Sequence, residues 1–282
     1  MSGLVAILGG QEHLPGVEPV DRRLLAESGM RRPTVAVLLA ATVPARIRAK
    51  IAESLAYWPR LGARVRFAYT GVPGETEQAL DVLTDPDLVV LTGGRPWLIQ
   101  RRLTAPIVER LLCLSDDGVP LSGSSAGAMA LGTWRVDLRP NHVPRMRAGL
   151  GLVPGAAAPH YGRHGLHHAS RVFAHRHPYV PFLGLQDRTA LVGRDGSYEV
   201  MGAGSATILH GDTRRHYPAG GQVTLERTPA PVATRPVAVE PAGAGSGRVA
   251  VAPAGGGCDA MSTALWQPAW TVTAMTDTMA RP

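Results

Sequence analysis

The chain has 282 residues, of which 45% are apolar and 18% are charged, a mixture that fits a globular protein with a sizeable core. Its formal net charge of +7 comes mostly from arginines that occur singly or in pairs, without the basic helix stripe or aromatic-rich basic loop of a nucleic-acid-binding protein. No stretch approaches the roughly 18 uninterrupted apolar residues of a transmembrane helix. We therefore expect neither nucleic acid nor a membrane as a partner. The positive charge is that of solvated faces or of a surface that attracts an acidic substrate.

The amino-terminal segment and the cysteines favour a cytoplasmic protein. Residues 1–10 lack the basic region that opens a signal peptide. Cys113 and Cys258 lie far apart in the sequence, so a disulfide framework is not expected. Cys113 falls on an apparent helix face, where we expect it to pack in the core.

Short apolar runs rich in β-forming residues alternate with helical patterns over the first 125 residues. Strands are predicted at 4–8, 34–39, 65–69, 88–91 and 119–122. Helices are predicted at 21–28, 44–62, 76–83 and around 107–112. This alternation predicts an α/β fold of three layers, with a doubly wound and mostly parallel sheet covered on both faces.

The helix predicted at 44–62 is amphipathic and ends at a glycine. Ile47, Ile51, Leu55 and Trp58 recur at helical spacing, so we expect all four on the buried face, and Gly62 closes the helix.

Later strands are predicted at 189–192, 199–201 and 206–209, which we interpret as the far edge of the same sheet. After about residue 226 the sequence consists largely of Pro, Ala, Gly and Val without periodicity, and it cannot bury enough apolar surface to offset the entropy of ordering. We therefore predict one domain at 1–226 and a largely disordered tail at 227–282.

Three chemically suggestive segments directly follow predicted strands. They are Gly9-Gly10, Gly93-Gly94 and Ser125. Because reactive groups of parallel α/β sheets gather at the carboxyl ends of the strands, these segments are expected to share one site.

Ser125 is the candidate nucleophile. The segment Gly123-Ser-Ser-Ala-Gly matches the Gly-x-Ser-x-Gly pattern, in which a serine occupies a sharp, strained strand-to-helix turn. A helix beginning at Ala126 would direct its first amide toward a developing oxyanion. The pattern taken alone also fits an ordinary glycine-rich turn.

Several further motifs occur in a fixed order with this one. They are Leu91-Thr-Gly-Gly, Gly123-Ser-Ser-Ala-Gly-Ala-Met, Gly149-Leu-Gly-Leu-Val-Pro followed by His160-Tyr161, and Gly184-Leu-Gln-Asp-Arg-Thr-Ala-Leu-Val. Together, over about residues 4–212, the chain resembles the cyanophycinase and dipeptidase E family of serine peptidases. The resemblance implies a flavodoxin-like fold of the class I glutamine amidotransferase-like type.

The resemblance also implies roles for individual residues. Ser125 would be the nucleophile, His160 the general base and Asp187 the acid that orients it, with the amides of Gly94 and Ala126 forming the oxyanion hole. No metal or organic cofactor would be required. Such a triad needs only that the base reach the serine and that the acid fix the tautomer of the base.

Alternatives remain for the histidine and for the acid. Five more histidines crowd the segment after His160, namely His164, His167, His168, His175 and His177. Their spacing is not the usual one of a zinc site, so a solvated histidine-rich loop or a loop with one catalytic base is favoured over a metal site. Dipeptidase E takes its acid from between serine and histidine, which makes Asp137 the competitor of Asp187, and Asp187 could instead cap a turn.

The chain departs from cyanophycinases where those enzymes hold their substrate. Arg95-Pro96 and Ala158-Pro159 stand where cyanophycinase-like enzymes carry Asp-Gln. Arg163 is our candidate for binding a substrate carboxylate, and Arg171 is a second; each could equally be a surface arginine.

The leading hypothesis is a serine peptidase or dipeptidase that cleaves short peptides, with an acidic or isopeptide-linked residue beside the cut. A non-peptidase ester or amide hydrolase, or an acyl transferase of a small metabolite, is the second hypothesis. A non-catalytic binding module is the third. The expected partner is a small peptide substrate, and a homodimer is the candidate assembly.

Overall fold

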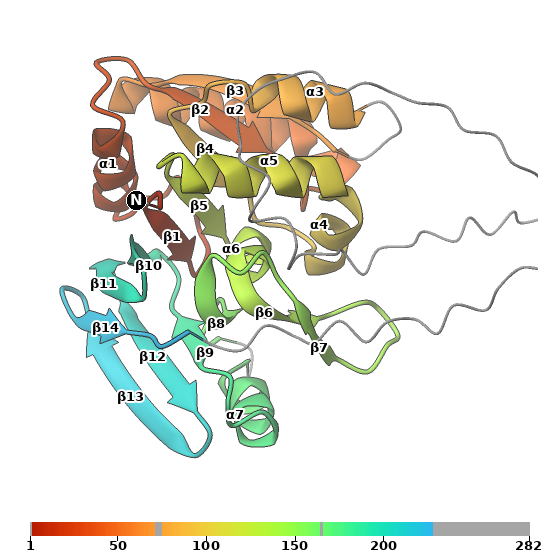
Figure 1. Ribbon diagram of the computed structural model, residues 1–282, viewed down its shortest axis with the longest axis vertical. Coiled ribbons are helices and arrows are strands. Elements are labelled where there is room, and N and C mark those ends of the chain that lie inside the picture. Colours follow the sequence, from red (N-terminus) through yellow and green to blue (C-terminus); the bar gives the residue numbers. More distant parts are fainter. Residues whose placement is uncertain (1, 71–74, 164–165, 228–282) are drawn as a thin grey trace, which may run out of the picture. The chain divides into compact units, whose positions relative to one another are not determined.

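The computed structural model describes residues 2–70, 75–163 and 166–227 (Figure 1). All of them fall within one unit, Met1–Pro231. The tail predicted at 227–282 lies, apart from Arg227, outside the described residues. No helix within the described part of the chain is long and apolar enough to cross a membrane.

The larger sheet has eight strands in the order β14-β11-β10-β1-β5-β4-β2-β3. Its parallel strands are β1 (Val5–Leu8), β5 (Leu121–Ser124), β4 (Leu88–Leu91), β2 (Thr34–Leu38) and β3 (Arg64–Ala68). Antiparallel strands extend it on the side of β1, namely β10 (Thr189–Arg194), β11 (Ser197–Gly202) and β14 (Gln222–Thr224). The five strands predicted in the first 125 residues therefore all exist and all lie in this sheet.

Both faces of this sheet are covered, as the near-continuous apolar runs predict. One face packs on α1 (Glu18–Glu27), on α2 (Ile47–Tyr57) and on the 3-10 helix η2 (Trp58–Leu61), in a core that includes Leu4, Ala6 and Leu8 of the β1 segment. Val5 and Ile7 point to the opposite face and are also buried. The remaining helices of this part of the chain are η1 (Pro44–Arg46), α3 (Glu75–Val82), α4 (Pro96–Arg102), α5 (Ala105–Asp116) and α6 (Ala126–Leu131).

A second sheet, which was not predicted from the sequence, follows α6. It has six strands in the order β13-β12-β9-β8-β6-β7. Their bounds are β6 (Gly132–Asp137), β7 (Arg145–Ala148), β8 (Val153–Ala158), β9 (Phe182–Leu185), β12 (Ser205–His210) and β13 (Thr213–Pro218). Helix α7 (Leu166–Arg176) packs against it through Ala174, which joins a core with Phe182 and Leu209.

Two expectations about packing were wrong. The strand predicted at 206–209 does not extend the main sheet, because β12 pairs with β9 and β13 in the second sheet. Leu55 is 51% exposed, although Trp58 is buried. The buried stripe of α2 passes through Ser54 instead, and Tyr57 and Trp58 follow it three and four residues later on the same face.

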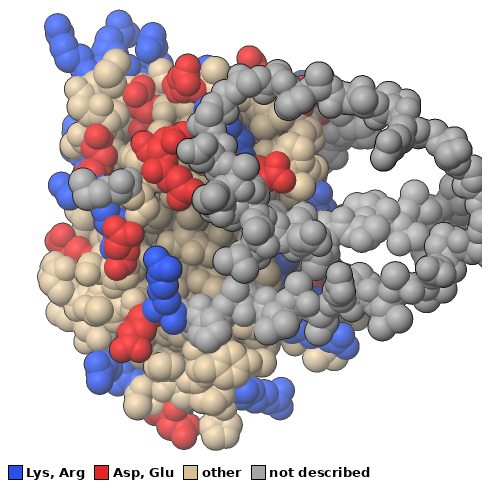
Figure 2. Space-filling model, viewed as in Figure 1, with Lys and Arg blue, Asp and Glu red and all other residues tan. Residues whose placement is uncertain are grey.

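On the face shown in Figure 2, Lys and Arg side chains lie scattered among acidic ones. This distribution agrees with the scattered positions of the arginines in the sequence.

The core between α1 and α2 holds one carboxyl group. Asp21 of α1 is 6% exposed, and its Oδ2 accepts a hydrogen bond from the Tyr57 hydroxyl at 2.5 Å. Burial raises the pKa of Asp21 from 3.8 to about 7, even though the hydrogen bond from Tyr57 works in the opposite direction.

This buried acid predicts a pH-dependent stability. Between about pH 4 and pH 7 the folded protein binds the Asp21 proton more tightly than the unfolded chain, so the free energy of unfolding falls as pH rises through this range. Asp21→Asn removes the titration and keeps an acceptor for Tyr57. We expect its melting temperature, relative to wild type, to be higher at pH 8 than at pH 4. The corresponding change in the free energy of unfolding has an upper bound on the order of 4 kcal/mol.

Thermal unfolding of the two proteins at both pH values measures this difference. Asp116→Asn, at an exposed position of α5, is the matched control, and its pH-dependent difference from wild type should be smaller than that of Asp21→Asn. An Asp21→Asn effect of equal size at pH 4 and pH 8 would contradict the assignment.

Candidate active site

The order of the parallel strands brings the three predicted loop segments together. Strand β5 lies between β1 and β4, and all three run in the same direction. Ser125 therefore leaves the sheet between Gly9-Gly10, which follows β1, and the loop that follows β4. The three segments therefore lie at the carboxyl ends of adjacent strands, the place where reactive groups of such sheets gather.

Ser125 occupies a strained turn between β5 and α6. Its backbone angles are φ 50° and ψ −108°, outside the regions that a serine ordinarily adopts. Gly127 allows the turn, since a Cβ atom there would lie 2.2 Å from the carbonyl oxygen of Leu91 on β4. The glycine after the serine thus lets α6 start in direct contact with the neighbouring strand, as expected for a nucleophile elbow.

The structure brings together the serine, histidine and aspartate that the sequence singled out. His160 Nε2 lies 2.9 Å from Ser125 Oγ, and His160 Nδ1 lies 2.6 Å from Asp187 Oδ1. Ser125 comes from the main sheet, His160 follows β8 of the second sheet, and Asp187 lies between β9 and β10. The site is therefore built where the two sheets meet.

Consecutive carbonyl groups after β1 hold all three segments. The carbonyl of Leu8 accepts from the amide of Ser125, that of Gly9 from the amide of His160, and that of Gly10 from the amide of Arg188, each at 2.9 Å. Backbone hydrogen bonds to one short stretch thus fix the nucleophile, the imidazole and the residue next to Asp187 relative to one another.

Gly10 also leaves the space that the imidazole fills. It has φ +130°, and a Cβ atom on it would lie 2.2 Å from Cε1 of His160. Any other residue at this position would push the ring away from Ser125.

The two amides expected to form an oxyanion hole lie in segments next to the serine. Ala126 is the first residue of α6, where amide groups have no acceptor within the helix. Gly94 follows Gly93, and a Cβ atom on Gly93 would lie 3.2 Å from Cβ of Ser125. The loop after β4 therefore packs against the nucleophile.

Arg163, the candidate for substrate binding, contacts the triad. Its Nη1 lies 2.8 Å from Oδ2 of Asp187, while its side chain stays 57% exposed. Asp187 therefore contacts His160 through one oxygen and Arg163 through the other.

Asp137, the alternative acid, lies elsewhere. It is on β6 of the second sheet, where its Oδ2 pairs with Arg139 at 2.9 Å and lies 3.9 Å from Arg147. In this structure the contact with His160 is made by Asp187.

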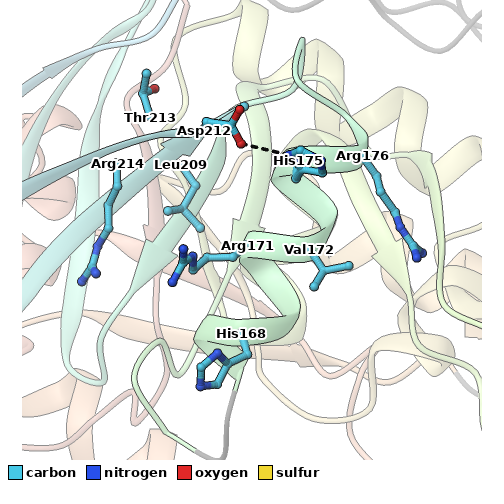
Figure 3. Close-up of a pocket in the computed structure, with 10 residues that line it drawn as sticks. His168, Arg171, Val172, His175, Arg176, Leu209, Asp212, Thr213 and Arg214 are labelled. Atoms are coloured by element: carbon cyan, nitrogen blue, oxygen red, sulfur yellow. Dashed lines mark hydrogen bonds and ion pairs between the residues drawn. The ribbon is translucent and has the colours of Figure 1, made fainter.

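The competing histidines lie on or near α7, apart from His164, which is outside the described residues. His168 and His175 line a cavity of about 620 Å³ together with Arg171 and Arg214, and His175 Nδ1 lies 2.9 Å from Asp212 (Figure 3). The residues of this cavity do not include Ser125, His160 or Asp187. In the part of the chain that the structure describes, no group of three His, Cys, Asp or Glu side chains could hold a metal ion.

One carboxylate beside the site was not predicted from the sequence. Glu12 lies in the loop after β1, and its side chain is only 11% exposed. It accepts hydrogen bonds from Ser124 Oγ at 2.6 Å, from Lys50 Nζ at 2.7 Å and from the amide of Gly93 at 3.3 Å. Its place two residues after Gly9-Gly10 was the only signal that could have revealed it.

Comparison with known proteins supports the class of enzyme that this geometry defines. A parallel α/β sheet with a serine on a strand-to-helix turn, a histidine and an aspartate is the arrangement of a serine-type hydrolase. Residues 7–201 match peptidase family S51, and the chain belongs to this family. It is thus a serine-type peptidase, in agreement with the resemblance seen in the sequence. No curated protein matches the chain significantly.

Two solved structures share the fold. A peptidase from an acI-B1 actinobacterium has 21% sequence identity and a TM-score of 0.69, with 80% of this chain and 98% of that chain covered. A putative peptidase E protein from Listeria monocytogenes EGD-e has 14% identity and a TM-score of 0.51, with 77% and 99% covered. They confirm the predicted α/β architecture, which is consistent with the class I glutamine amidotransferase-like fold.

The contact between Gly10 and the imidazole predicts a specific loss of activity. Gly10→Ala should displace His160 and lower the reactivity of Ser125 by about 10²-fold, the cost that misplacing a catalytic group by about 1 Å can have. The reaction rate of Ser125 with a fluorophosphonate probe measures the effect.

Gly29→Ala is the matched control, because Gly29 also has positive φ (+64°) but nothing within 4 Å of an added Cβ atom. This variant should lose stability through backbone strain and keep its reaction rate. Equal rates for Gly10→Ala and wild type would show that the ring does not depend on this gap.

Proposed function

We propose that the protein hydrolyses short peptides through an acyl-enzyme formed on Ser125. The observation that carries this proposal is the continuous chain of contacts from Ser125 Oγ through the His160 ring to Asp187. Ser125 would be the nucleophile, His160 the general base and Asp187 the acid that orients it.

In the first half of the reaction, Ser125 Oγ attacks the scissile carbonyl carbon while His160 Nε2 takes the hydroxyl proton. Asp187 accepts a hydrogen bond from Nδ1, which leaves Nε2 free to act as the base and stabilises the imidazolium that forms. The amides of Gly94 and Ala126 would donate to the carbonyl oxygen as it becomes negative. Collapse of the tetrahedral intermediate breaks the C–N bond, and His160 returns the proton to the leaving amine.

In the second half, water takes the place of the amine. His160 removes a proton from this water, which attacks the acyl carbon, and the carboxylic acid leaves as Ser125 regains its proton. The residues named for this cycle require no metal ion or organic cofactor.

The substrate class is the finer part of the proposal. An acidic or isopeptide-linked residue beside the cut would suit Arg163, whose exposed guanidinium lies next to the triad through its contact with Asp187. Arg95-Pro96 and Ala158-Pro159 replace the Asp-Gln pairs of cyanophycinase-like enzymes, so a short peptide is favoured over cyanophycin itself.

Membership in a peptidase family favours peptide hydrolysis over the two other hypotheses from the sequence. Hydrolysis of small esters without activity on a broad dipeptide panel would instead favour the metabolite hydrolase or acyl transferase. A folded protein whose Ser125 fails to react with a fluorophosphonate would favour the binding module.

Probe labelling tests the nucleophile and the base together. We expect the fluorophosphonate to modify wild type at Ser125, as located by peptide mass spectrometry, and not to modify Ser125→Ala. His160→Ala should react about 10²–10⁴-fold more slowly, the usual contribution of a positioned general base. Labelling of Ser125→Ala to the wild-type extent would place the nucleophile at another residue.

Replacement of each candidate acid by its amide tests the third member. Asp187→Asn should lower the turnover number by about 10⁴-fold, because the amide favours the wrong imidazole tautomer. Asp137→Asn, which disturbs the pairs with Arg139 and Arg147 away from His160, should retain near wild-type activity. Equal or reversed losses on a responsive dipeptide would overturn the assignment of Asp187.

A further inference from the structure

Glu12 joins segments of the active site that are distant in the sequence. Its carboxylate lies in the loop after β1 and receives donors from Lys50 on α2, from Ser124 at the end of β5 and from Gly93 after β4. Two of these donors immediately precede the groups to which we assign chemistry. Ser124 precedes the nucleophile Ser125, and Gly93 precedes Gly94 of the oxyanion hole.

The carboxylate, the glycine loop and the nucleophile meet at one point. A Cβ atom on Gly93 would lie 3.2 Å from Cβ of Ser125 and 3.4 Å from Oε1 of Glu12. Gly93 therefore lies close to both the serine and the carboxylate. A shift of Glu12 would move the Gly93 amide, which lies one residue before the Gly94 amide.

The local backbone is shaped to present this side chain. The residues on either side of Glu12 both have positive φ, 61° at Gln11 and 67° at His13. Left-handed backbone is unfavourable at residues other than glycine and persists only where the surroundings hold it. The loop thus maintains two unfavourable conformations on either side of the carboxylate.

Lys50 keeps Glu12 ionised. Burial raises the pKa of Glu12, but the charge and hydrogen bond of Lys50, together with the hydrogen bond from Ser124, lower it to about 2. An ionised carboxylate can only accept hydrogen bonds, so Gly93 N–H and the Ser124 hydroxyl must both point toward it. Lys50 also neutralises a negative charge that would otherwise oppose the oxyanion nearby.

We propose that Glu12 is a positioning residue, whose carboxylate, paired with Lys50, clamps Gly93 and Ser124 so that the Gly94 amide stays aligned with Ser125. This inference rests on the proposed function, because the amide matters only if Ser125 reacts. Glu12 itself touches no reacting atom. Its effect should therefore appear in the rate of the chemical step and not in the binding of the reactant.

The first test uses the fluorophosphonate probe, which needs no known substrate. Ser125 Oγ attacks phosphorus and forms the P–O bond, fluoride leaves, and His160 accepts the proton. We expect Glu12→Gln to lower the maximal labelling rate by about 10–10²-fold, somewhat less than loss of a whole oxyanion donor, with the apparent dissociation constant of the probe unchanged.

The second test uses pH, since a purely structural role would not shift a pH profile. The charged and titratable groups around Glu12 are Lys50 and Glu53 of α2, His13 beside it, and Asp21 of α1. Lys50→Met removes the main cause of the low pKa of Glu12, so burial then raises the pKa of this carboxyl group. Glu12 then becomes protonated as pH falls, so the acid limb of the labelling rate should move to higher pH than in wild type. Adding Glu12→Gln to Lys50→Met should return the limb to its wild-type position.

Glu53→Gln is the matched control. Glu53 also pairs with Lys50, at 3.2 Å, but it is 41% exposed and its recorded partners, Arg46 and Lys50, lie outside the Gly93 loop. Its labelling rate and pH profile should equal those of wild type. Ser124→Ala is a second variant, to be used if Glu12→Gln does not fold. It should slow labelling several-fold without weakening probe binding.

The outcomes separate the two proposals. Wild type that folds but is not labelled at Ser125 overturns the proposed function and this inference with it. A labelled wild type, with Glu12→Gln reacting at the same maximal rate or with Lys50→Met keeping the wild-type pH profile, overturns the positioning role alone. If Glu12→Gln does not fold, an unchanged maximal rate in Ser124→Ala also overturns it.

Discussion

The site depends on one stretch of backbone at the end of β1. Three consecutive carbonyl groups, those of Leu8, Gly9 and Gly10, accept hydrogen bonds there. The donors are the backbone amides of Ser125, His160 and Arg188, so these hydrogen bonds hold the three segments of the triad in place relative to one another. A Cβ atom at Gly9 would lie 2.1 Å from the carbonyl oxygen of Gln186, and one at Gly10 would strike the His160 ring. These segments can approach one another so closely only because neither Gly9 nor Gly10 carries a side chain.

Two carboxylates lie behind the proposed catalytic groups. Asp187 lies behind the imidazole, is shared with the exposed Arg163, and fixes the orientation of the proposed base. Glu12 lies behind the Gly93 loop, is paired with the half-buried Lys50, and fixes the geometry of the proposed oxyanion hole. Each carboxylate acts through a neighbour, and in each case a cation pairs with the carboxylate.

The second sheet explains how a base can come from a segment that the main sheet does not contain. Strand β8 runs parallel to β9, and residues after their carboxyl ends supply His160 and Asp187 respectively. Tyr161, buried next to His160, donates its amide to the carbonyl of Leu185, which ties the two segments together. The triad is therefore assembled across both sheets, and its integrity requires that they stay packed.

The sequence alone determined the local features of this protein: the parallel strands with their apolar runs, the turn at Ser125, and the candidates His160 and Asp187 from ordered motifs. The strands and the turn are set by propensities and spacings within a few residues, whereas the two candidates follow from the resemblance of the ordered motifs to a peptidase family. It did not determine the partner of β12, the exposure of Leu55, or the role of Glu12, because each depends on contacts between segments far apart in the chain. Glu12 lies 112 positions from Ser124, and only the folded sheet brings that carboxylate to the nucleophile's neighbour. Tertiary structure likewise separated Asp187 from Asp137, since the choice between two carboxylates is a matter of which one reaches the imidazole.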